Sequence, residues 1–234
     1  MKRLAIVGMG KMGRAIDELA VSRGWEVVAR IGREQSAGGI TKDSLGGADV
    51  AIEVTTPHAA ASNVLGIVAA GCPVAVGTTG WYAELPRVSA DVQSRGGAML
   101  TATNFSLGVN IFEQVAELAA RLLGTAPGFE AHLRETHHSA KKDAPSGTAM
   151  TLGKTASAAY GREIPITSVR VGSVPGTHEF IFDAPFEQIH LEHIARDRRV
   201  FAEGALVAAA WLAGKRGVFT MRDVLSTPST GKTS

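Results

Sequence analysis

A glycine-rich turn placed directly after a short apolar run is the feature that most constrains this fold. Residues 4–7 are apolar and have the length of a buried strand, and the motif Gly8-Met9-Gly10-Lys11-Met12-Gly13 follows at once. Apolar residues then recur at helical spacing up to residue 20, and a second apolar run begins at Trp25. In such a unit the glycines permit a tight turn, close approach of a pyrophosphate and close helix packing. The motif predicts a nicotinamide or flavin dinucleotide site, with a merely tight strand-to-helix turn as the alternative.

The strand-then-helix rhythm continues to about residue 103. Uniformly apolar strands that alternate with helices are typical of a parallel sheet covered on both faces, so we expect a Rossmann-type α/β domain. The linker 33–47 is rich in Gly and Ser and should be a loop with at most one helical turn. The predicted strands are 4–7, 26–31, 50–54, 74–76 and 98–101, and the predicted helices begin after Gly10 and cover 58–70 and 82–95.

The pattern changes after Asn104. The spacing predicts helices over 109–123, 148–160 and 201–214, and strands over 129–136, 168–171, 178–182 and 187–195. Strict alternation in the last strand is typical of a half-buried antiparallel sheet. We therefore expect a dinucleotide-binding domain over 1–104, completed by 206–234, and a second α+β domain with an open, mainly antiparallel sheet over 105–205. The polar tail from Ser226 is expected to fray.

Two further segments belong with the glycine motif. Gly77-Thr78-Thr79-Gly80 follows one predicted strand, and Ala102-Thr103-Asn104-Phe105 follows the next. The carboxyl ends of parallel strands form the edge at which open α/β sheets bind ligands, although each segment alone could be an ordinary turn. Their common position favours a role in the cofactor site.

Residues 135–149 contain several side chains that can carry charge or transfer a proton. Two adjacent histidines, His137 and His138, precede two lysines and a Pro-Ser-Gly-Thr turn of the kind that opens a helix. Ser146 is a good N-cap, and the N–H groups of Gly147 and Thr148 would favour an anion there. Lys141 or Lys142 can add a full positive charge, and a histidine can move a proton near neutral pH. The segment indicates a pocket that binds and protonates a small carboxylate; the alternative is a polar surface loop.

Composition excludes several classes of partner. The net charge of +2 in 234 residues, without a basic run, gives no indication of nucleic acid binding. The single cysteine, Cys72, excludes an internal disulfide, and it is expected to be a buried thiol of a cytoplasmic protein. No apolar stretch reaches the ~20 residues of a membrane span. No metal is expected either, because neighbouring histidines in an extended segment point to opposite faces and no zinc motif is present.

With these motifs identified, the chain resembles the 4-hydroxy-tetrahydrodipicolinate reductase (dihydrodipicolinate reductase) family of the diaminopimelate–lysine pathway. The segment 135–149 resembles the central signature of that family, and 77–80 and 104–110 stand where the family has equivalent segments. The likeness extends through Arg170-x-Gly172, Gly176-x-His178, Phe201-Ala-x-Gly-Ala205 and Met221-Arg-Asp-Val-Leu225, and so covers nearly the whole chain. The departures are a shorter loop over 33–47 and Thr56 where some members carry arginine, and both concern the adenine end of the cofactor site.

The resemblance implies hydride transfer from NAD(P)H to a cyclic unsaturated dicarboxylate, giving tetrahydrodipicolinate. It implies His137 as the general acid/base and Lys141 as a second proton donor, with His138, Lys141, Ser146, Gly147, Thr148 and Thr79 at the substrate carboxylates. It also implies a homotetramer assembled through the sheet of the second domain. Two alternatives stay open: a dinucleotide-sensing protein without catalysis, and another NAD(P)-dependent oxidoreductase acting on aspartate-derived metabolites.

The end of the second predicted strand indicates which cofactor is preferred. An acidic residue about 20 positions after the glycine motif normally selects NAD, and Gly32 stands where that acid is expected. Arg30 and Arg33 instead offer guanidinium groups suited to a 2′-phosphate, although Glu34 follows immediately. We therefore expect NADPH to serve at least as well as NADH. The expected cofactor-binding residues are Gly8, Met9, Gly10, Lys11, Met12, Gly13, Arg33, Gly77, Thr78, Thr79, Ala102, Thr103, Asn104 and Phe105.

Overall fold

A computed structural model describes residues 1–36 and 38–226, and the chain divides into two compact units. The first unit joins Met1–Leu107 to the chain from Arg199 onward, and the second is Gly108–Arg198. The return to the first unit was expected at residue 206, which falls inside helix α7 (Arg199–Leu212). The boundary lies at Arg199 because the first turns of α7 already bury Ala202 and Ala205 in the core of the first unit.

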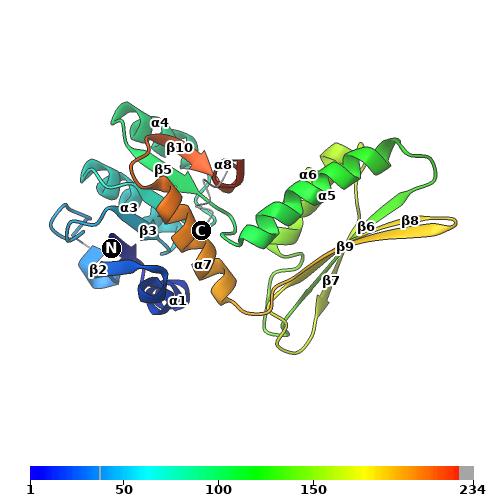
Figure 1. The fold of residues 1–234 in the computed structure, drawn as a ribbon, viewed down its shortest axis with the longest axis horizontal. Helices are drawn as coiled ribbons and strands as arrows, with labels where there is room; N and C mark the ends of the chain where they lie inside the picture. The colour runs from blue at the N-terminus through cyan, green and yellow to red at the C-terminus, as the bar shows by residue number, and fades with distance from the viewer. Residues whose placement is uncertain (37, 227–234) are drawn as a thin grey trace, which may run out of the picture. The chain divides into compact units, whose positions relative to one another are not determined.

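The first unit is built on a six-stranded sheet in the order β10-β5-β4-β3-β1-β2, and every pair of neighbours is parallel. This confirms the Rossmann-type sheet. Strands β2, β3, β5 and β10 of this sheet are labelled in Figure 1. The strands are β1 (Lys2–Val7), β2 (Trp25–Ile31), β3 (Val50–Glu53), β4 (Val74–Val76), β5 (Ala98–Thr101) and β10 (Gly217–Thr220).

Alternate residues of the strands face two separate cores. Leu4 and Ile6 of β1 pack with α1 and α7, whereas Ala5 and Val7 pack with α3 and α4. Both faces of the sheet are therefore apolar, which explains why the strands appear as continuous hydrophobic runs. The helices of this unit are α1 (Lys11–Ala20), the 3-10 turn η1 (Val21–Arg23), the single turn α2 (Arg33–Ser36), α3 (Pro57–Ala69), α4 (Leu85–Ser94), α7 and α8 (Met221–Ser226).

Two elements near the C-terminus were not predicted. Strand β10 adds to the sheet beside β5, with Gly217 opposite Ala98, and α8 follows it without a break. The strand has only four residues and follows a glycine- and lysine-containing turn, so its pattern alone is too short to identify it. The tail that was expected to fray lies, beyond Ser226, outside the described residues.

The second unit packs two helices on one face of a four-stranded sheet, in the order β7-β6-β8-β9. Strand β6 pairs parallel with β7 and antiparallel with β8, so the open sheet is mixed, with two of its three pairings antiparallel. Its core joins Phe112 of α5, Leu152 of α6 and the strand residues Leu133, Phe180 and Phe182. The elements are α5 (Leu107–Thr125), β6 (Glu130–His137), α6 (Gly147–Tyr160), β7 (Ile166–Arg170), β8 (Thr177–Ala184) and β9 (Glu187–Ile194).

Within the described residues, no helix combines the length and apolar character that crossing a membrane requires.

The glycine motif gives a stability prediction. A Cβ at Gly13 would lie 1.9 Å from the carbonyl oxygen of Gly8, whereas a Cβ at Gly10 would meet nothing within 4 Å. Gly13→Ala should therefore lower the free energy of unfolding by about 1–3 kcal/mol, the usual cost of overpacking. Gly10→Ala, the control, should stay within about 1 kcal/mol of the unsubstituted chain. Urea unfolding measures both, and equal stability of the two variants would contradict the close packing.

Candidate active site

The glycine motif forms the turn between β1 and α1 at the carboxyl edge of the first sheet. Gly8 has a φ of +105°, which favours glycine, and its N–H donates to the carbonyl of Ile31 at 2.8 Å. Gly10 is the N-cap of α1, and no side chain caps the helix there. An open helix start beside a glycine turn suits a phosphate group. The predicted residues Gly8, Met9, Gly10, Lys11, Met12 and Gly13 thus all lie in this turn and the start of α1.

A hollow of about 250 Å³ brings the three predicted cofactor segments together. Met12 contributes from the glycine motif and Gly77 from the turn after β4. Residues Ala102, Thr103, Asn104 and Phe105 contribute from the segment after β5. A Cβ at Gly77 would lie 2.5 Å from the Phe105 ring, so glycine allows these two segments to touch. Val54 and Phe201 complete the lining and were not predicted from the sequence.

A buried carboxyl group lies beneath this edge. Glu53, the last residue of β3, is fully buried and accepts hydrogen bonds from the Thr55 hydroxyl and from Asn63 Nδ2. Thr78 Oγ1 in turn accepts a hydrogen bond from the Thr55 N–H at 2.7 Å. Thr55 therefore connects the Glu53 carboxyl group to Thr78, and so the turn after β3 to the turn after β4. Burial raises the pKa of Glu53, against the hydrogen bonds of its neighbours, and its Oε2 has no partner among the described residues. Thr79, next in the chain, is exposed.

The two arginines considered for a 2′-phosphate lie in different environments. Arg30 is held by a two-bond ion pair with Asp17 of α1, with both nitrogen–oxygen distances at 2.8 Å. Arg33 is exposed on α2 and forms no ion pair within the described part of the chain. Arg33 is therefore the better placed of the two to meet an added phosphate.

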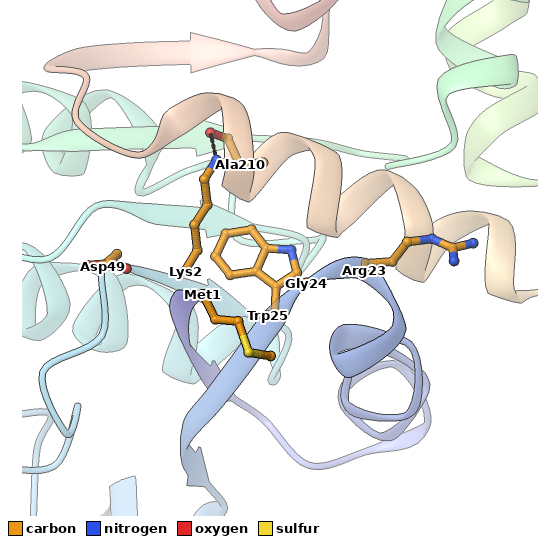
Figure 2. Close-up of a pocket in the computed structure, with 7 residues that line it drawn as sticks. All are labelled: Met1, Lys2, Arg23, Gly24, Trp25, Asp49 and Ala210. Atoms are coloured by element: carbon orange, nitrogen blue, oxygen red, sulfur yellow. Dashed lines mark hydrogen bonds between the residues drawn. The ribbon is translucent and has the colours of Figure 1, made fainter. Parts of the chain in front are cut away.

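The opposite, amino edge of the same sheet also carries a hollow, at the starts of β1 and β2 (Figure 2). Lys2 lies there over the ring of Trp25, 5.7 Å from its centre, and its ammonium group donates to the carbonyl of Ala210 at 3.4 Å. These contacts join the first strand to α7. None of the residues predicted for binding lines this hollow.

In the second unit, the predicted acid His137 is the last residue of β6 and is 8% exposed. Its Nδ1 bonds to the carboxylate of Glu135, two residues earlier on the same face of the strand. Burial lowers the pKa of His137, the bond to Glu135 raises it, and the positive charges of Lys141 and Arg170 lower it further. His138 lies just beyond the strand, where its Nε2 accepts from Arg198 at 2.8 Å.

The start of α6 has the predicted cap. The Ser146 hydroxyl accepts from the N–H of Ala149 at 3.1 Å, and a Cβ at Gly147 would meet nothing within 4 Å. Thr148, the second residue of α6, is partly buried. In the loop before the helix, the Lys141 ammonium group pairs with the Asp143 carboxylate at 2.8 Å. The helix start, one lysine and the predicted acid therefore belong to one short stretch of the second unit.

Three residues of this cluster were not assigned from the sequence. Arg170, at the end of β7, binds both oxygens of Glu135. His178 of β8 lies edge-on to His137, with ring centres 5.3 Å apart, and burial with the charge of His137 lowers its pKa to about 4. Glu135 shares a face with His137 by strand alternation, so that signal was present in the sequence. Placing Arg170 and His178 required the pairing of separate strands.

Comparison with known proteins gives matches along most of the chain. The family model "Dihydrodipicolinate reductase, N-terminus" matches residues 2–105, and "Dihydrodipicolinate reductase, C-terminus" matches 108–225. The 4-hydroxy-tetrahydrodipicolinate reductase of Christiangramia forsetii is 34% identical, over 95% of this chain and 97% of the relative. That of Thiobacillus denitrificans is 35% identical, over 95% and 98%.

Solved structures share the fold. A dipicolinate-bound dihydrodipicolinate reductase from Paenisporosarcina superposes with a TM-score of 0.81 at 22% identity, covering 94% of this chain and 97% of that one. An aspartate dehydrogenase from Thermotoga maritima reaches a TM-score of 0.51 at 13% identity, over 89% and 94%. At these identities the likeness concerns the fold alone.

The buried carboxyl group gives a pH-dependent prediction. Because the pKa of Glu53 is raised in the folded chain, its favourable contribution to stability is present below its ordinary value of 4.5 and is lost as the pH rises through the folded pKa. Glu53→Gln cannot ionise, so its stability relative to the unsubstituted chain should improve as the pH rises from 4.5 to the folded pKa of Glu53 and level off above it. Thermal unfolding of both proteins across this range measures the difference. A difference that does not vary with pH would contradict a raised pKa.

Proposed function

The chain belongs to the dihydrodipicolinate reductase family. From that membership we propose that 4-hydroxy-tetrahydrodipicolinate loses water to give dihydrodipicolinate, and that the protein reduces this compound to tetrahydrodipicolinate with a hydride from NAD(P)H and a proton. The reaction is a step of diaminopimelate and lysine biosynthesis. The observation that carries the proposal is the match of both halves of the chain to one enzyme family, over residues 2–105 and 108–225.

The first unit suits the dinucleotide. The glycine turn and the open start of α1 would hold the pyrophosphate, and the hollow lined by Met12, Gly77 and Phe105 would take a flat ring. The cofactor would supply a hydride. The remaining predicted contacts, from Lys11, Thr78, Thr79, Ala102, Thr103 and Asn104, stay part of this proposal.

The second unit suits a dicarboxylate that must gain a proton. Hydride addition to a conjugated imine leaves an electron-rich atom, and His137 would protonate it, with Lys141 as the second donor. Lys141 and the N–H groups at the start of α6 give charge-assisted hydrogen bonds to carboxylates. His138, Ser146, Gly147 and Thr148 would complete that site. The contact of Thr79 with the substrate rests on the family resemblance.

The two alternatives are not favoured. A dinucleotide sensor needs neither the buried His137 nor the capped helix start beside Lys141, and both are present. Another oxidoreductase of aspartate-derived metabolites would share the fold, as the aspartate dehydrogenase does, but at 13% identity. The curated relatives at 34% and 35% identity carry the reductase name instead.

A homotetramer assembled through the second sheet is also part of the proposal. One face of this sheet is covered by α5 and α6, and the other carries the exposed apolar side chains of Val169 and Ile194. A second sheet could cover such a face.

Two substitutions test the proposed proton donors. His137→Gln or Lys141→Ala should lower kcat by about 100-fold, the usual size of a lost general acid. NADPH binding should barely change, because both residues lie outside the unit that carries the glycine turn. Lys142→Ala is the matched control, since Lys142 is an exposed neighbour in the same loop. NADPH oxidation with the cyclic substrate measures turnover, and near-normal rates in both variants would refute the assignment.

A third substitution tests the preferred cofactor. We propose that NADPH serves at least as well as NADH because Arg33 is available to a 2′-phosphate. Arg33→Ala should then raise the KM for NADPH more than the KM for NADH, whereas Arg30→Ala should affect the two cofactors alike because Asp17 already holds Arg30. Steady-state specificity constants decide this. A tenfold or larger preference for NADH that Arg33→Ala leaves unchanged would show that the arginine does not meet the cofactor.

A further inference from the structure

The carboxylate of Glu135 is the centre of the polar cluster in the second unit. It is 0% exposed, and both of its oxygens are bonded. Oε2 accepts from His137 Nδ1 and from Arg170 Nη1 at 3.0 Å; Oε1 accepts from Arg170 Nη2 at 2.7 Å and from the N–H of Ser146 at 3.3 Å. A buried carboxylate is tolerable only with such a set of partners. Burial opposes its ionisation, yet the hydrogen bonds from Arg170, Ser168 and His137 hold the pKa of Glu135 at about 2.

We propose that Glu135 is a positioning residue of the reductase, because its carboxylate holds His137 in one tautomer and fixes that ring against the start of α6. The proposal rests on the proposed function and adds a residue that acts through His137 rather than on the substrate.

The tautomer follows from the charge on Glu135. An ionised carboxylate only accepts hydrogen bonds, so His137 must carry a proton on Nδ1. Nε2 is then the ring nitrogen that exchanges a proton with a ligand. A Cβ at position 176 would lie 3.0 Å from that nitrogen, and Gly176 therefore leaves the space beside it uncrowded. The negative charge also favours the imidazolium form, against the effect of burial.

The same carboxylate is also connected to Lys141, the second predicted proton donor, through Arg170 and Asp143. While Arg170 binds Glu135, its Nη2 also donates to the carbonyl of Asp143 at 2.6 Å. The Asp143 side chain pairs with Lys141. Since Glu135 bonds directly to the N–H of Ser146 as well, one buried group connects the histidine, the lysine loop and the anion-binding end of α6.

A second glutamate of the same sheet provides a matched control. Glu179 of β8 is 7% exposed and binds Arg134 and His190, so it repeats the combination of one carboxylate, one arginine and one histidine. Arg134 and Glu179 are direct cross-strand neighbours, and they alternate with Leu133 and Phe180, which face the helices. Glu179 therefore lies on the other face of the sheet, away from His137.

The variant test is Glu135→Gln, which keeps the shape of the side chain and removes its charge. We expect kcat to fall roughly 10- to 100-fold with the KM for NADPH unchanged. The basic limb of the kcat/KM profile should move to lower pH by about one unit or more, because the imidazolium form loses its counter-charge. Glu135→Asp should recover part of the rate and of the pH profile, and Glu179→Gln should leave both unchanged.

A purely structural role predicts a different result. In that case Glu135→Gln would lower the midpoint of thermal unfolding while the pH profile stayed in place, and this outcome would overturn the proposal. The same shift of the profile in Glu179→Gln would overturn it as well.

A measurement on the unsubstituted protein covers the case in which Glu135→Gln fails to fold. The ¹⁵N chemical shifts of His137 in its neutral form should show a protonated Nδ1 and an unprotonated Nε2. The opposite tautomer would overturn the proposal. Because this measurement needs no turnover, its failure is distinguishable from failure of the proposed reaction.

Discussion

The candidate active site of the second unit depends on one buried charge. Glu135 cannot remain ionised inside the sheet without partners, and the chain provides them from three elements: His137 at the end of β6, Arg170 at the end of β7 and the N–H of Ser146 at the start of α6. Removing a partner from such a group costs more than the bond itself, because the charge is left unpaired. The ends of β6 and β7 and the start of α6 are therefore constrained to meet at one place, which carries the proposed proton donors.

The first unit is constrained mainly by close contacts between its backbone and neighbouring groups. Gly8 adopts a positive φ, Gly13 lies against the carbonyl of Gly8, and Gly77 lies against the ring of Phe105. In each case a side chain would fill the space, so glycine is a steric requirement. These contacts bring the turns after β1, β4 and β5 to the same sheet edge, where ligands of open α/β sheets bind. The backbone contacts of the first unit and the buried charge of the second are thus separate constraints, each confined to its own unit.

Much of this arrangement could be predicted from the sequence because it is local. The glycine turn, the N-cap at Ser146 and the predicted strands of both sheets depend on neighbouring residues, and the structure has each of them. Strand β10 could not be identified, because four residues beside a turn carry too little pattern. The return of the chain to the first unit was placed seven residues late, at 206 instead of 199, because the first turns of α7 already bury Ala202 and Ala205 in the core of that unit.

The positions of Arg170 and His178 in the cluster could not be predicted, because they depend on which strands pair. Arg170 follows Glu135 by 35 residues and reaches it only because β6 and β7 pair in parallel. His178 meets His137 only through the antiparallel pairing of β6 and β8. Periodicity indicates which face a residue occupies, but strand order decides which residues meet on that face. The roles assigned to all of the predicted site residues, His137, Lys141 and Arg33 included, remain predictions.

We propose that the start of α6 and Lys141 form a dicarboxylate site beside the buried His137. A crystal structure of the chain with pyridine-2,6-dicarboxylate and NADPH would test this proposal, because it locates the carboxylates. We expect one carboxylate at the N–H groups of Gly147 and Thr148, within hydrogen-bond distance of Lys141. A dicarboxylate bound away from residues 137–148, with Lys141 still paired to Asp143, would contradict it.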